Sequence, residues 1–190
     1  PVDEQFDQVD VVGPLDGRTV SSMSCSGGEA ALMSDLLDGR NLVAKPFTAE
    51  QQMAVEATLS ELVTVANPLD YHTFIWGNEA RLTATFEAVM RARFDLSLLV
   101  LDFPRGDRCS DASWHPTLRG FAEATRRTGS KAALVASLGE LMPERIVAAA
   151  AELGLGALAG LAEGLDAAEA AATIGEAYRA AVAEPLLQPG

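Results

Sequence analysis

The sequence has few positively charged residues, and this shortage argues against nucleic acids and anionic membranes as partners. The 190 residues hold 14 Lys and Arg against 27 Asp and Glu, which gives a net charge of −13. Such a chain repels nucleic acid and anionic membranes, because binding to either depends largely on clustered basic side chains. We expect neither as a partner, so backbone dipoles or a few basic side chains must hold any bound phosphate.

Cysteines and long apolar runs are scarce as well. Cys25 and Cys109 are too few for a disulfide framework and lack the spacing of a zinc site, so we expect no metal centre. No run approaches the roughly 20 apolar residues of a membrane span, and no signal peptide opens the sequence. These absences predict a cytoplasmic protein, long enough for one domain with a single sizeable core.

The chain is expected to have three parts. Residues 1–16 carry five acidic and no basic side chains and are predicted to be an acidic linker. A domain is predicted over 17–184 and a tail over 185–190. Within the domain, strand-like and helix-like segments alternate, and the strands are predicted at 19–24, 41–45, 95–102, 131–137 and 156–159.

This alternation predicts the fold class. Residues 96–102 read LSLLVLD, a continuous apolar run typical of a strand covered on both faces. Strands that alternate with helices imply a parallel sheet between two helical layers. We therefore predict a three-layer, doubly wound α/β domain of flavodoxin-like strand order 2-1-3-4-5. In such sheets ligands bind at the carboxyl ends of the strands, where the strand order reverses.

The turn SCSGGE after the first strand is the main candidate site. Two glycines between a strand and a helix leave backbone N–H groups unpaired and allow an anion to approach. We predict phosphate binding by Ser26, Gly27, Gly28 and Glu29. The alternative is a turn that only lets helix and strand pack closely. The segment has neither the G-x-G-x-x-G spacing nor the G-K-[ST] of nucleotide-binding loops.

A nucleophilic role for Cys25 is the weaker reading of the same turn. A nucleophile elbow needs small residues two before and two after the nucleophile, and here they are Met23 and Gly27, so half the pattern fails. No convincing His–acid pair follows. We therefore assign no catalytic residue.

Two other segments supply candidates for lining the site. Residues 67–77 read NPLDYHTFIWG and place aromatic side chains in a turn-rich stretch, either as a buried lid or as a ligand surface. The loop after the central strand carries further charges, which are either solvated or turned toward an anion. Asp102 ends that strand, but no second ligand cluster supports a metal there. The candidate lining residues are Asn67, Asp70, His72 and Arg105.

Together, segments 24–37, 67–77 and 96–102 give the chain a family resemblance. It resembles the NDP-forming acyl-CoA synthetases, relatives of succinyl-CoA synthetase that include ADP-forming acetyl-CoA synthetase. The likeness runs over about 14–178 and matches the flavodoxin-like CoA-ligase domain that follows the domain with the phosphorylated histidine. Its specific motifs are S-G-G at residues 26–28 and N-P-[VL]-D at residues 67–70.

The resemblance implies an acid–thiol ligase. Carboxylic acid, CoA and ATP would give acyl-CoA, ADP and phosphate through an acyl phosphate and a phosphohistidine, with the S-G-G turn facing the phosphohistidine. The family's Ser-His-Thr-Gly segment is missing, because His72 lies in Tyr-His-Thr and His115 in Trp-His-Pro. The chain therefore resembles one domain of a larger synthetase, inactive alone and without a cofactor of its own.

In the full enzyme, CoA and ATP or ADP with Mg would be bound by partner domains. These are a CoA-binding Rossmann domain, a phosphohistidine domain and an ATP-grasp domain, and homo-oligomerisation stays open. The alternative is a non-catalytic flavodoxin-like binding or docking module.

Overall fold

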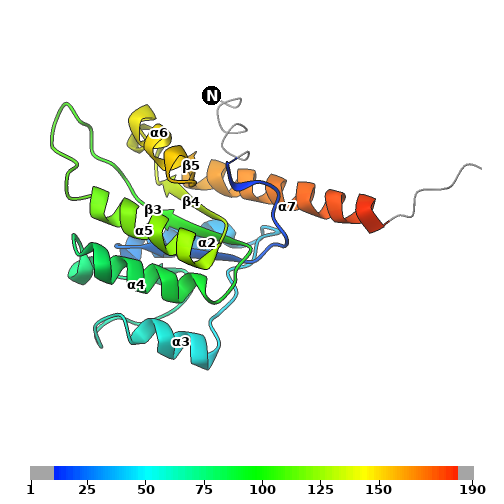
Figure 1. The fold of residues 1–190 in the computed structure, drawn as a ribbon, viewed down its shortest axis with the longest axis horizontal. Helices are drawn as coiled ribbons and strands as arrows, with labels where there is room; N and C mark the ends of the chain where they lie inside the picture. Colours follow the sequence, from blue (N-terminus) through cyan, green and yellow to red (C-terminus); the bar gives the residue numbers. More distant parts are fainter. Residues whose placement is uncertain (1–10, 184–190) are drawn as a thin grey trace, which may run out of the picture.

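The computed structural model describes residues 11–183, which form a five-stranded parallel sheet with helices on both faces (Figure 1). The strand order is β2-β1-β3-β4-β5 and every neighbouring pair is parallel, so the predicted fold class and strand order are confirmed. The expected tail and residues 1–10 of the expected linker lie outside the described residues. The strands are β1 (Val20–Ser24), β2 (Leu69–Asp70), β3 (Leu96–Val100), β4 (Ala132–Ala136) and β5 (Gly156–Ala159).

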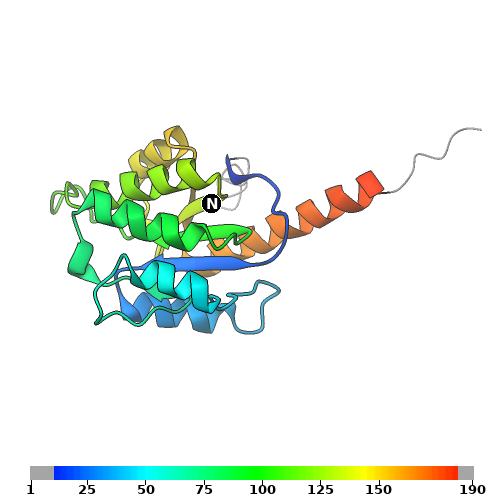
Figure 2. The same cartoon turned by 60° about the horizontal axis from the view of Figure 1, so that its bottom comes forward.

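The helices divide between the two faces of the sheet (Figures 1 and 2). Helices α3 to α6 pack into one hydrophobic core, and α2 and α7 pack into the other. The two short 3-10 helices, η1 (Thr73–Ile75) and η2 (Gly139–Leu141), follow β2 and β4. The α-helices are α2 (Gly27–Leu37), α3 (Ala49–Glu56), α4 (Glu79–Met90), α5 (His115–Thr128), α6 (Glu144–Glu152) and α7 (Leu161–Ala183).

Strand β3 shows why the central strands are apolar throughout. All five of its residues are buried. Successive side chains of a strand point to opposite faces, so Leu98 and Val100 join the core under α2 and α7, whereas Leu99 joins the core under α4 and α5. A strand covered on both sides has no position for an exposed polar side chain, which is what the LSLLVLD run indicated.

The expected second strand at 41–45 is wrong. Only Val43 pairs there, in an isolated parallel bridge to Thr19 with two hydrogen bonds to the neighbouring backbone. Its side chain is 53% exposed, and Pro46 cannot donate a ladder hydrogen bond, so the segment leaves the sheet. The position beside β1 is taken instead by β2, which pairs with Met23 and Ser24.

The Asn67 side chain lies between Val43 and β2 along the edge of β1. Its Oδ1 accepts a hydrogen bond from the Ser22 N–H (3.1 Å), and its Nδ2 donates to the carbonyls of Val20 (2.8 Å) and Lys45 (3.0 Å). The carboxamide thus satisfies backbone groups of β1 that an ordinary neighbouring strand would satisfy. The outer edge of β1 is closed by Val43, the Asn67 side chain and β2 in turn.

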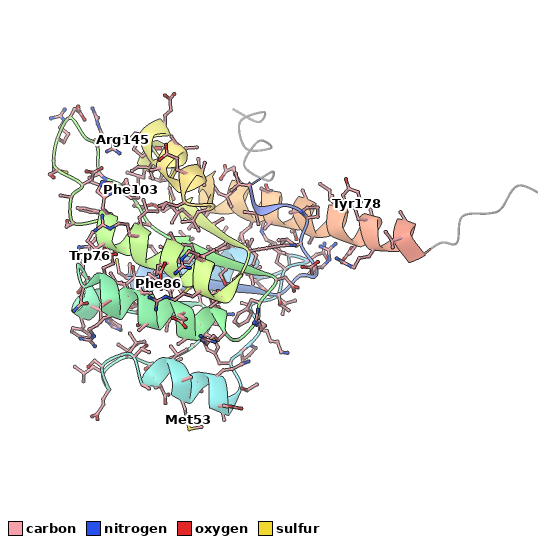
Figure 3. The ribbon with its side chains drawn as sticks, viewed as in Figure 1. Met53, Trp76, Phe86, Phe103, Arg145 and Tyr178 are labelled. Atoms are coloured by element: carbon pink, nitrogen blue, oxygen red, sulfur yellow. The ribbon has the colours of Figure 1, made fainter. Side chains whose placement is uncertain are left out.

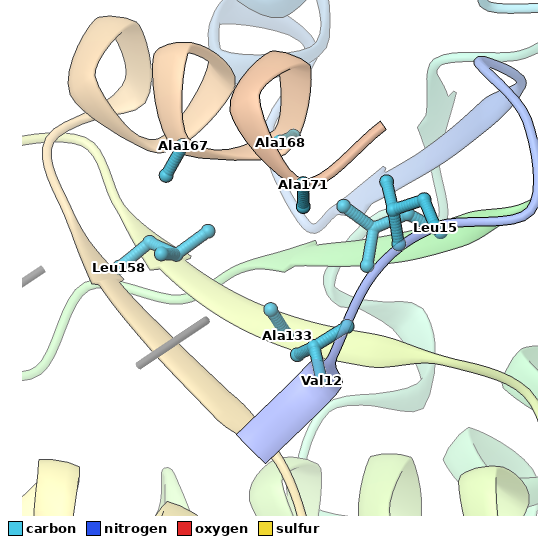
Figure 4. Close-up of a pocket in the computed structure, with 8 residues that line it drawn as sticks. Val12, Leu15, Ala133, Leu158, Ala167, Ala168 and Ala171 are labelled. Carbon is cyan, nitrogen blue, oxygen red and sulfur yellow. The ribbon is translucent and has the colours of Figure 1, made fainter. Parts of the chain in front are cut away.

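Residues 11–16, the described part of the expected linker, lie against α7. Leu15 is fully buried. Its N–H donates to the Ala171 carbonyl (3.0 Å), and the Leu15 carbonyl accepts a hydrogen bond from the Arg179 side chain (3.0 Å). Gly175 has no room for a Cβ, which would overlap the Leu15 carbonyl oxygen. Figure 4 shows Val12 and Leu15 at a small apolar pocket between α7 and the sheet.

Helix α7 begins at Leu161, and its C-terminal half extends beyond the sheet (Figures 1 and 2). Three large apolar residues are exposed there: Ile174 is 42%, Tyr178 63% and Val182 86% exposed. Figure 3 shows Tyr178 on this projecting part. Within residues 11–183 no helix is both long and apolar enough to cross a bilayer.

Candidate functional site

The predicted site lies where the carboxyl ends of β1, β2 and β3 meet. Strand β1 leads through Cys25 and Ser26 into α2, β2 leads into Tyr71 and His72, and β3 leads into Asp102. These strands are neighbours in the order β2-β1-β3, so their exits share one edge of the sheet. Open α/β sheets bind their ligands at this edge.

The turn into α2 leaves two backbone amides without a partner. Ser26 is the N-cap: its Oγ accepts from the Glu29 N–H (3.4 Å), and its carbonyl accepts from the Ala30 N–H (3.1 Å). Among the described residues, the N–H groups of Gly27 and Gly28 have no acceptor, and both glycines are exposed. Two free donors at the positive end of a helix dipole can bind an oxyanion.

Asp70 brings negative charge to the same turn. Its Oδ2 lies 3.2 Å from the position that a Cβ on Gly27 would take, so the missing side chain allows the carboxylate to approach. Its Oδ1 accepts from the His72 N–H (2.8 Å), and its Oδ2 is 3.5 Å from His72 Nε2. These contacts hold His72 at φ 57°, an uncommon conformation for a residue other than glycine, with its ring stacked on Phe74.

This environment raises the pKa values of Glu29 and Cys25. Partial burial, followed by the nearby Asp102 and Asp70, raises the pKa of Glu29 to about 7. Burial, followed by Glu29, raises the pKa of the Cys25 thiol to about 11. A thiol that stays protonated at neutral pH is a poor nucleophile, which agrees with the incomplete elbow pattern. Cys25 and Cys109 are both free.

Asp102 joins the cluster from the end of β3, at the carboxyl edge where the sequence places the loop after the central strand. Its carboxylate accepts hydrogen bonds from the Ser137 N–H (2.6 Å) and from the Ser137 hydroxyl. The available signal was that Asp102 and Ser137 directly follow the neighbouring strands β3 and β4. Across residues 11–183, no three potential metal-ligating side chains are arranged to hold a cation.

Tyr71 forms the inner wall of the cluster. Its side chain is fully buried, with the ring edge-on to Phe86 (centroids 5.3 Å apart), and its hydroxyl makes no hydrogen bond of ordinary geometry. Burial, together with Cys25, Glu29 and Asp70 nearby, raises its pKa well above the ordinary value. The weakly polar Cys25 thiol is the group nearest to a pairing partner for this hydroxyl.

The remaining candidates lie elsewhere or are already paired. Asn67 is bound into the edge of the sheet, as described above. Arg105 is exposed in the loop after β3, and its guanidinium makes two hydrogen bonds to Asp107 (3.0 and 2.7 Å). In segment 67–77, Trp76 packs edge-on against Trp114, which precedes α5 (centroids 5.5 Å apart). Part of this segment therefore has a structural role. Figure 3 shows Trp76 at this end of the domain.

Comparison with known proteins supports the fold. No protein-family model matches the sequence, and no curated protein matches it significantly. Among solved structures, PH0766 from Pyrococcus horikoshii OT3 aligns with 90% of this chain at 18% identity and a TM-score of 0.67, over 40% of its own length.

A second solved structure is acetyl-coenzyme A synthetase 1 of Ca. Korarchaeum cryptofilum, described as dinucleotide forming and solved with phosphate and ADP. It aligns with 97% of this chain at 15% identity and a TM-score of 0.68, again over 40% of its length. The apo form gives 14% identity and a TM-score of 0.66 over 39% of its length. The predicted resemblance is thus confirmed at the level of the fold, and this chain has the fold of about two fifths of each of these longer chains.

Proposed function

We propose that this chain is one domain of an NDP-forming acyl-CoA synthetase, an acid–thiol ligase that converts carboxylic acid, CoA and ATP into acyl-CoA, ADP and phosphate. The observation that carries the proposal is the S-G-G turn at the switch point of the sheet, with free amides at Gly27 and Gly28. It is supported by the fold shared with a synthetase that was solved with phosphate and ADP. The expected setting is the cytoplasm.

In this proposal the α2 N-terminus faces a phosphoryl group that another domain carries. The two free amides and the helix dipole favour an oxyanion, and Gly28 leaves the approach open, because the nearest atom to an added Cβ is Ser26 Oγ at 3.6 Å. An acyl phosphate or a phosphohistidine would present such an oxyanion.

The chain supplies no obvious nucleophile for the covalent step. The raised pKa of Cys25 keeps its thiol protonated. His72 is held by Asp70 and stacked on Phe74, outside the family's Ser-His-Thr-Gly pattern. We therefore assign the phosphorylated histidine, the CoA site and the ATP and Mg site to partner domains of the larger enzyme.

Phosphate titration of the backbone amides tests the anion site. The largest NMR shifts should fall on Ser26 through Glu29, with weak affinity, since an exposed helix N-terminus favours an anion by only about 0.3–1 kcal/mol. Gly28→Val should abolish them, because a branched side chain would stand where the anion approaches. Gly139→Val is the matched control, since no atom lies within 4 Å of its added Cβ and it belongs to η2 rather than to the turn. Shifts centred on His72 or Arg119, or none at high phosphate, would remove the main physical support.

A non-catalytic docking module is the second candidate. It is favoured by an apolar stripe of α7, formed by Ile174, Tyr178 and Val182, which the rest of residues 11–183 leaves exposed. The same titration separates the two functions, because a docking module has no need to bind an anion at α2.

A further inference from the structure

Four exposed arginines gather at the C-terminal ends of α4 and α5, which run side by side (Figures 1 and 2). Arg91 and Arg93 directly follow the last turn of α4, and Arg126 and Arg127 lie in the last turn of α5. We call this surface the arginine face. Both helices follow strands of a parallel sheet, so their C-terminal ends lie at the edge opposite the S-G-G turn.

Two glutamates lie beneath three of these arginines. Glu87 accepts hydrogen bonds from Arg91 Nε (3.1 Å) and Arg127 Nη1 (3.2 Å), and Glu123 accepts from the Nε atoms of Arg126 (2.8 Å) and Arg127 (2.7 Å). The glutamate side chains are 18% and 31% exposed, whereas those of the three arginines are between 48% and 72% exposed. Guanidinium groups therefore form the outer surface. One terminal nitrogen of each has no acceptor among the described residues.

Arg93 adds a charge that no carboxylate of residues 11–183 pairs with. Its Nη1 donates to the Thr128 carbonyl at the end of α5 (3.2 Å), and its backbone has φ 60°, a conformation that costs glycine less than arginine. Asp95, the next acidic residue along the chain, is engaged elsewhere, because it accepts from the N–H (2.8 Å) and hydroxyl (2.6 Å) of Thr19. The arginine face thus holds four positive charges against two negative ones.

This positive surplus stands out in so acidic a protein. The face holds 4 of the 14 basic residues and 2 of the 27 acidic ones, which leaves 10 basic against 25 acidic residues in the remainder. Cations at a helix C-terminus are favoured by the helix dipole, but each helix end supplies only about half a negative charge. Two helix ends and two glutamates therefore leave about one guanidinium charge uncompensated, and the face attracts groups of opposite sign.

We propose that the arginine face binds an acidic segment of a partner protein, whose carboxylates accept hydrogen bonds from the free guanidinium N–H groups. The planar guanidinium group matches a carboxylate with two parallel hydrogen bonds. Glu87 and Glu123 already hold three of the arginines, so binding orders few additional side chains. A nucleic acid fits less well, because its phosphates would extend from the face onto the acidic remainder. The inference goes beyond the proposed function and uses no residue of the S-G-G turn.

An oligoglutamate peptide is the probe, titrated into the full 190-residue chain and followed by backbone amide NMR shifts. The largest shifts should fall within 87–93 and 123–128. The dissociation constant should rise between about 20 and about 200 mM NaCl, because salt screens exposed charges. The double variant Arg91→Gln/Arg126→Gln should bind about tenfold more weakly. Its fold should survive, because Glu87 and Glu123 both keep Arg127 as a partner.

Two further variants separate the face from net charge and from stability. Arg105→Gln/Arg108→Gln is the matched control, because it removes two exposed arginines from the loop after β3 and changes the net charge equally. It should bind the peptide as wild type does. Arg93→Gly removes one charge of the face at a backbone conformation that suits glycine. It should weaken binding about threefold without lowering the free energy of unfolding in urea.

Three results would overturn the inference. Equal weakening in the two double variants, or shifts centred elsewhere, would mean that the peptide senses only net charge. Tighter binding of an oligonucleotide than of oligoglutamate with the same number of charges would assign the face to nucleic acid. Self-association of the chain in sedimentation velocity at low salt, lost in Arg91→Gln/Arg126→Gln, would assign it to a second copy. All three leave the phosphate titration of the S-G-G turn unaffected, so the proposed function is tested separately.

Discussion

At the scale of single residues, the Asn67 side chain takes the place of a neighbouring strand by hydrogen-bonding to the backbone of β1. It was expected to line the site, but both ends of its carboxamide are engaged with backbone groups of β1 and of Lys45. Its partners include two carbonyl oxygens, which need a hydrogen-bond donor such as the Asn67 NH₂ group. Its role is therefore to close the β1 edge and, through that edge, to hold β2 and Asp70 in place.

Asn67→Asp should be strongly destabilising although the two side chains have nearly the same shape. The change replaces an NH₂ group with an acceptor that faces the carbonyls of Val20 and Lys45. We expect the free energy of unfolding in urea at pH 7 to fall by about 2–3 kcal/mol. Asn78→Asp is the control, because Asn78 only accepts from the Arg81 N–H as a helix cap, and Asp caps as well as Asn. Equal losses in both variants would contradict this role.

Glu29 should make the folded chain less stable as pH rises. Its pKa is raised from 4.5 to about 7 in the folded state, so between these values the folded chain holds a proton that the unfolded chain has released. Stability is therefore lost as pH rises through this window. Glu29→Gln should recover it, with a gain at pH 8 over pH 5 on the order of 1 kcal/mol, since solvent screens a half-buried group. Urea unfolding at both values measures the gain, and Glu50→Gln should show no difference between them.

At the scale of elements, α4 and α5 meet closely on one face of the sheet. Phe86 of α4 and Phe121 of α5 pack edge-on with centroids 5.6 Å apart, and both are fully buried. Figure 3 shows Phe86 between these helices. Gly120 permits the approach: a Cβ there would lie 3.2 Å from the Leu82 Cβ and from the Thr83 backbone nitrogen.

Gly120→Val should separate the two helices. The contact is with backbone, which cannot rotate away, so overpacking is expected to lower the free energy of unfolding by about 1–3 kcal/mol. Gly139→Val, with open space around its Cβ, should lower it much less. Chemical denaturation of the two variants gives the comparison. A Gly120→Val variant that is as stable as wild type, with unchanged NMR shifts of the Phe86 and Phe121 aromatic rings, would refute the close packing.

The elements also show where sequence patterns carry information. Strands β3 and β4 follow nearly continuous apolar runs, LSLLV and AALVA, and the Thr48–Gln51 capping box that begins α3 is a local pattern that can be read from the sequence. Strand β2 has only two residues, too few to show a period, and Asn67 takes its place in the edge through tertiary contacts alone. The segment 41–45 has the composition of a strand but only one bridge to pair with.

The same distinction applies to the candidate site. The position of the S-G-G turn follows from local rules of strand, glycine and helix, and the structure places it at the expected edge. The predicted architecture already places Asp70 near the turn, but the effect of Asp70 and Asp102 on Glu29 depends on side-chain burial, which the sequence alone does not give. Likewise, the pairing of Arg105 with Asp107 depends on the conformation of a loop that has no periodic signal.

At the scale of the whole molecule, the sheet separates two hydrophobic cores, and residues 11–16 pack over one of them. Leu15 belongs to the core under α2 and α7, and the Lys131 side chain reaches Asp16 (3.1 Å) and the Pro14 carbonyl from the start of β4. This stretch is therefore bound to the domain by its backbone as well as by its side chains.

Gly175→Ala should detach this stretch. Alanine would normally stabilise a helix interior by up to about 1 kcal/mol, but here its Cβ overlaps the Leu15 carbonyl. We expect a net loss of about 1–3 kcal/mol and faster hydrogen exchange at the Leu15 amide, which is bonded to Ala171. Gly139→Ala should leave that amide protected. Unchanged Leu15 exchange in Gly175→Ala would show that the backbone contact is not tight.

The chain by itself should form no acyl-CoA from ATP, CoA and a carboxylic acid. It lacks the family's phosphorylated-histidine segment, and binding alone cannot supply the covalent step. A coupled assay on protein purified free of host synthetases checks this. ADP release that depends on both CoA and acid would contradict the one-domain proposal and make His72 and Cys25 candidate nucleophiles.

The composite edge beside β1 also bears on unwanted assembly. A strand from another molecule extends a sheet only where it finds a continuous row of free N–H and C=O groups, and long exposed edges of this kind promote aggregation. Here the groups of β1 are consumed by Val43, a side-chain amide and the two residues of β2, so the last strand on this side is too short to act as a template. Asn67 thus protects this edge of the sheet against edge-to-edge polymerisation in addition to stabilising it.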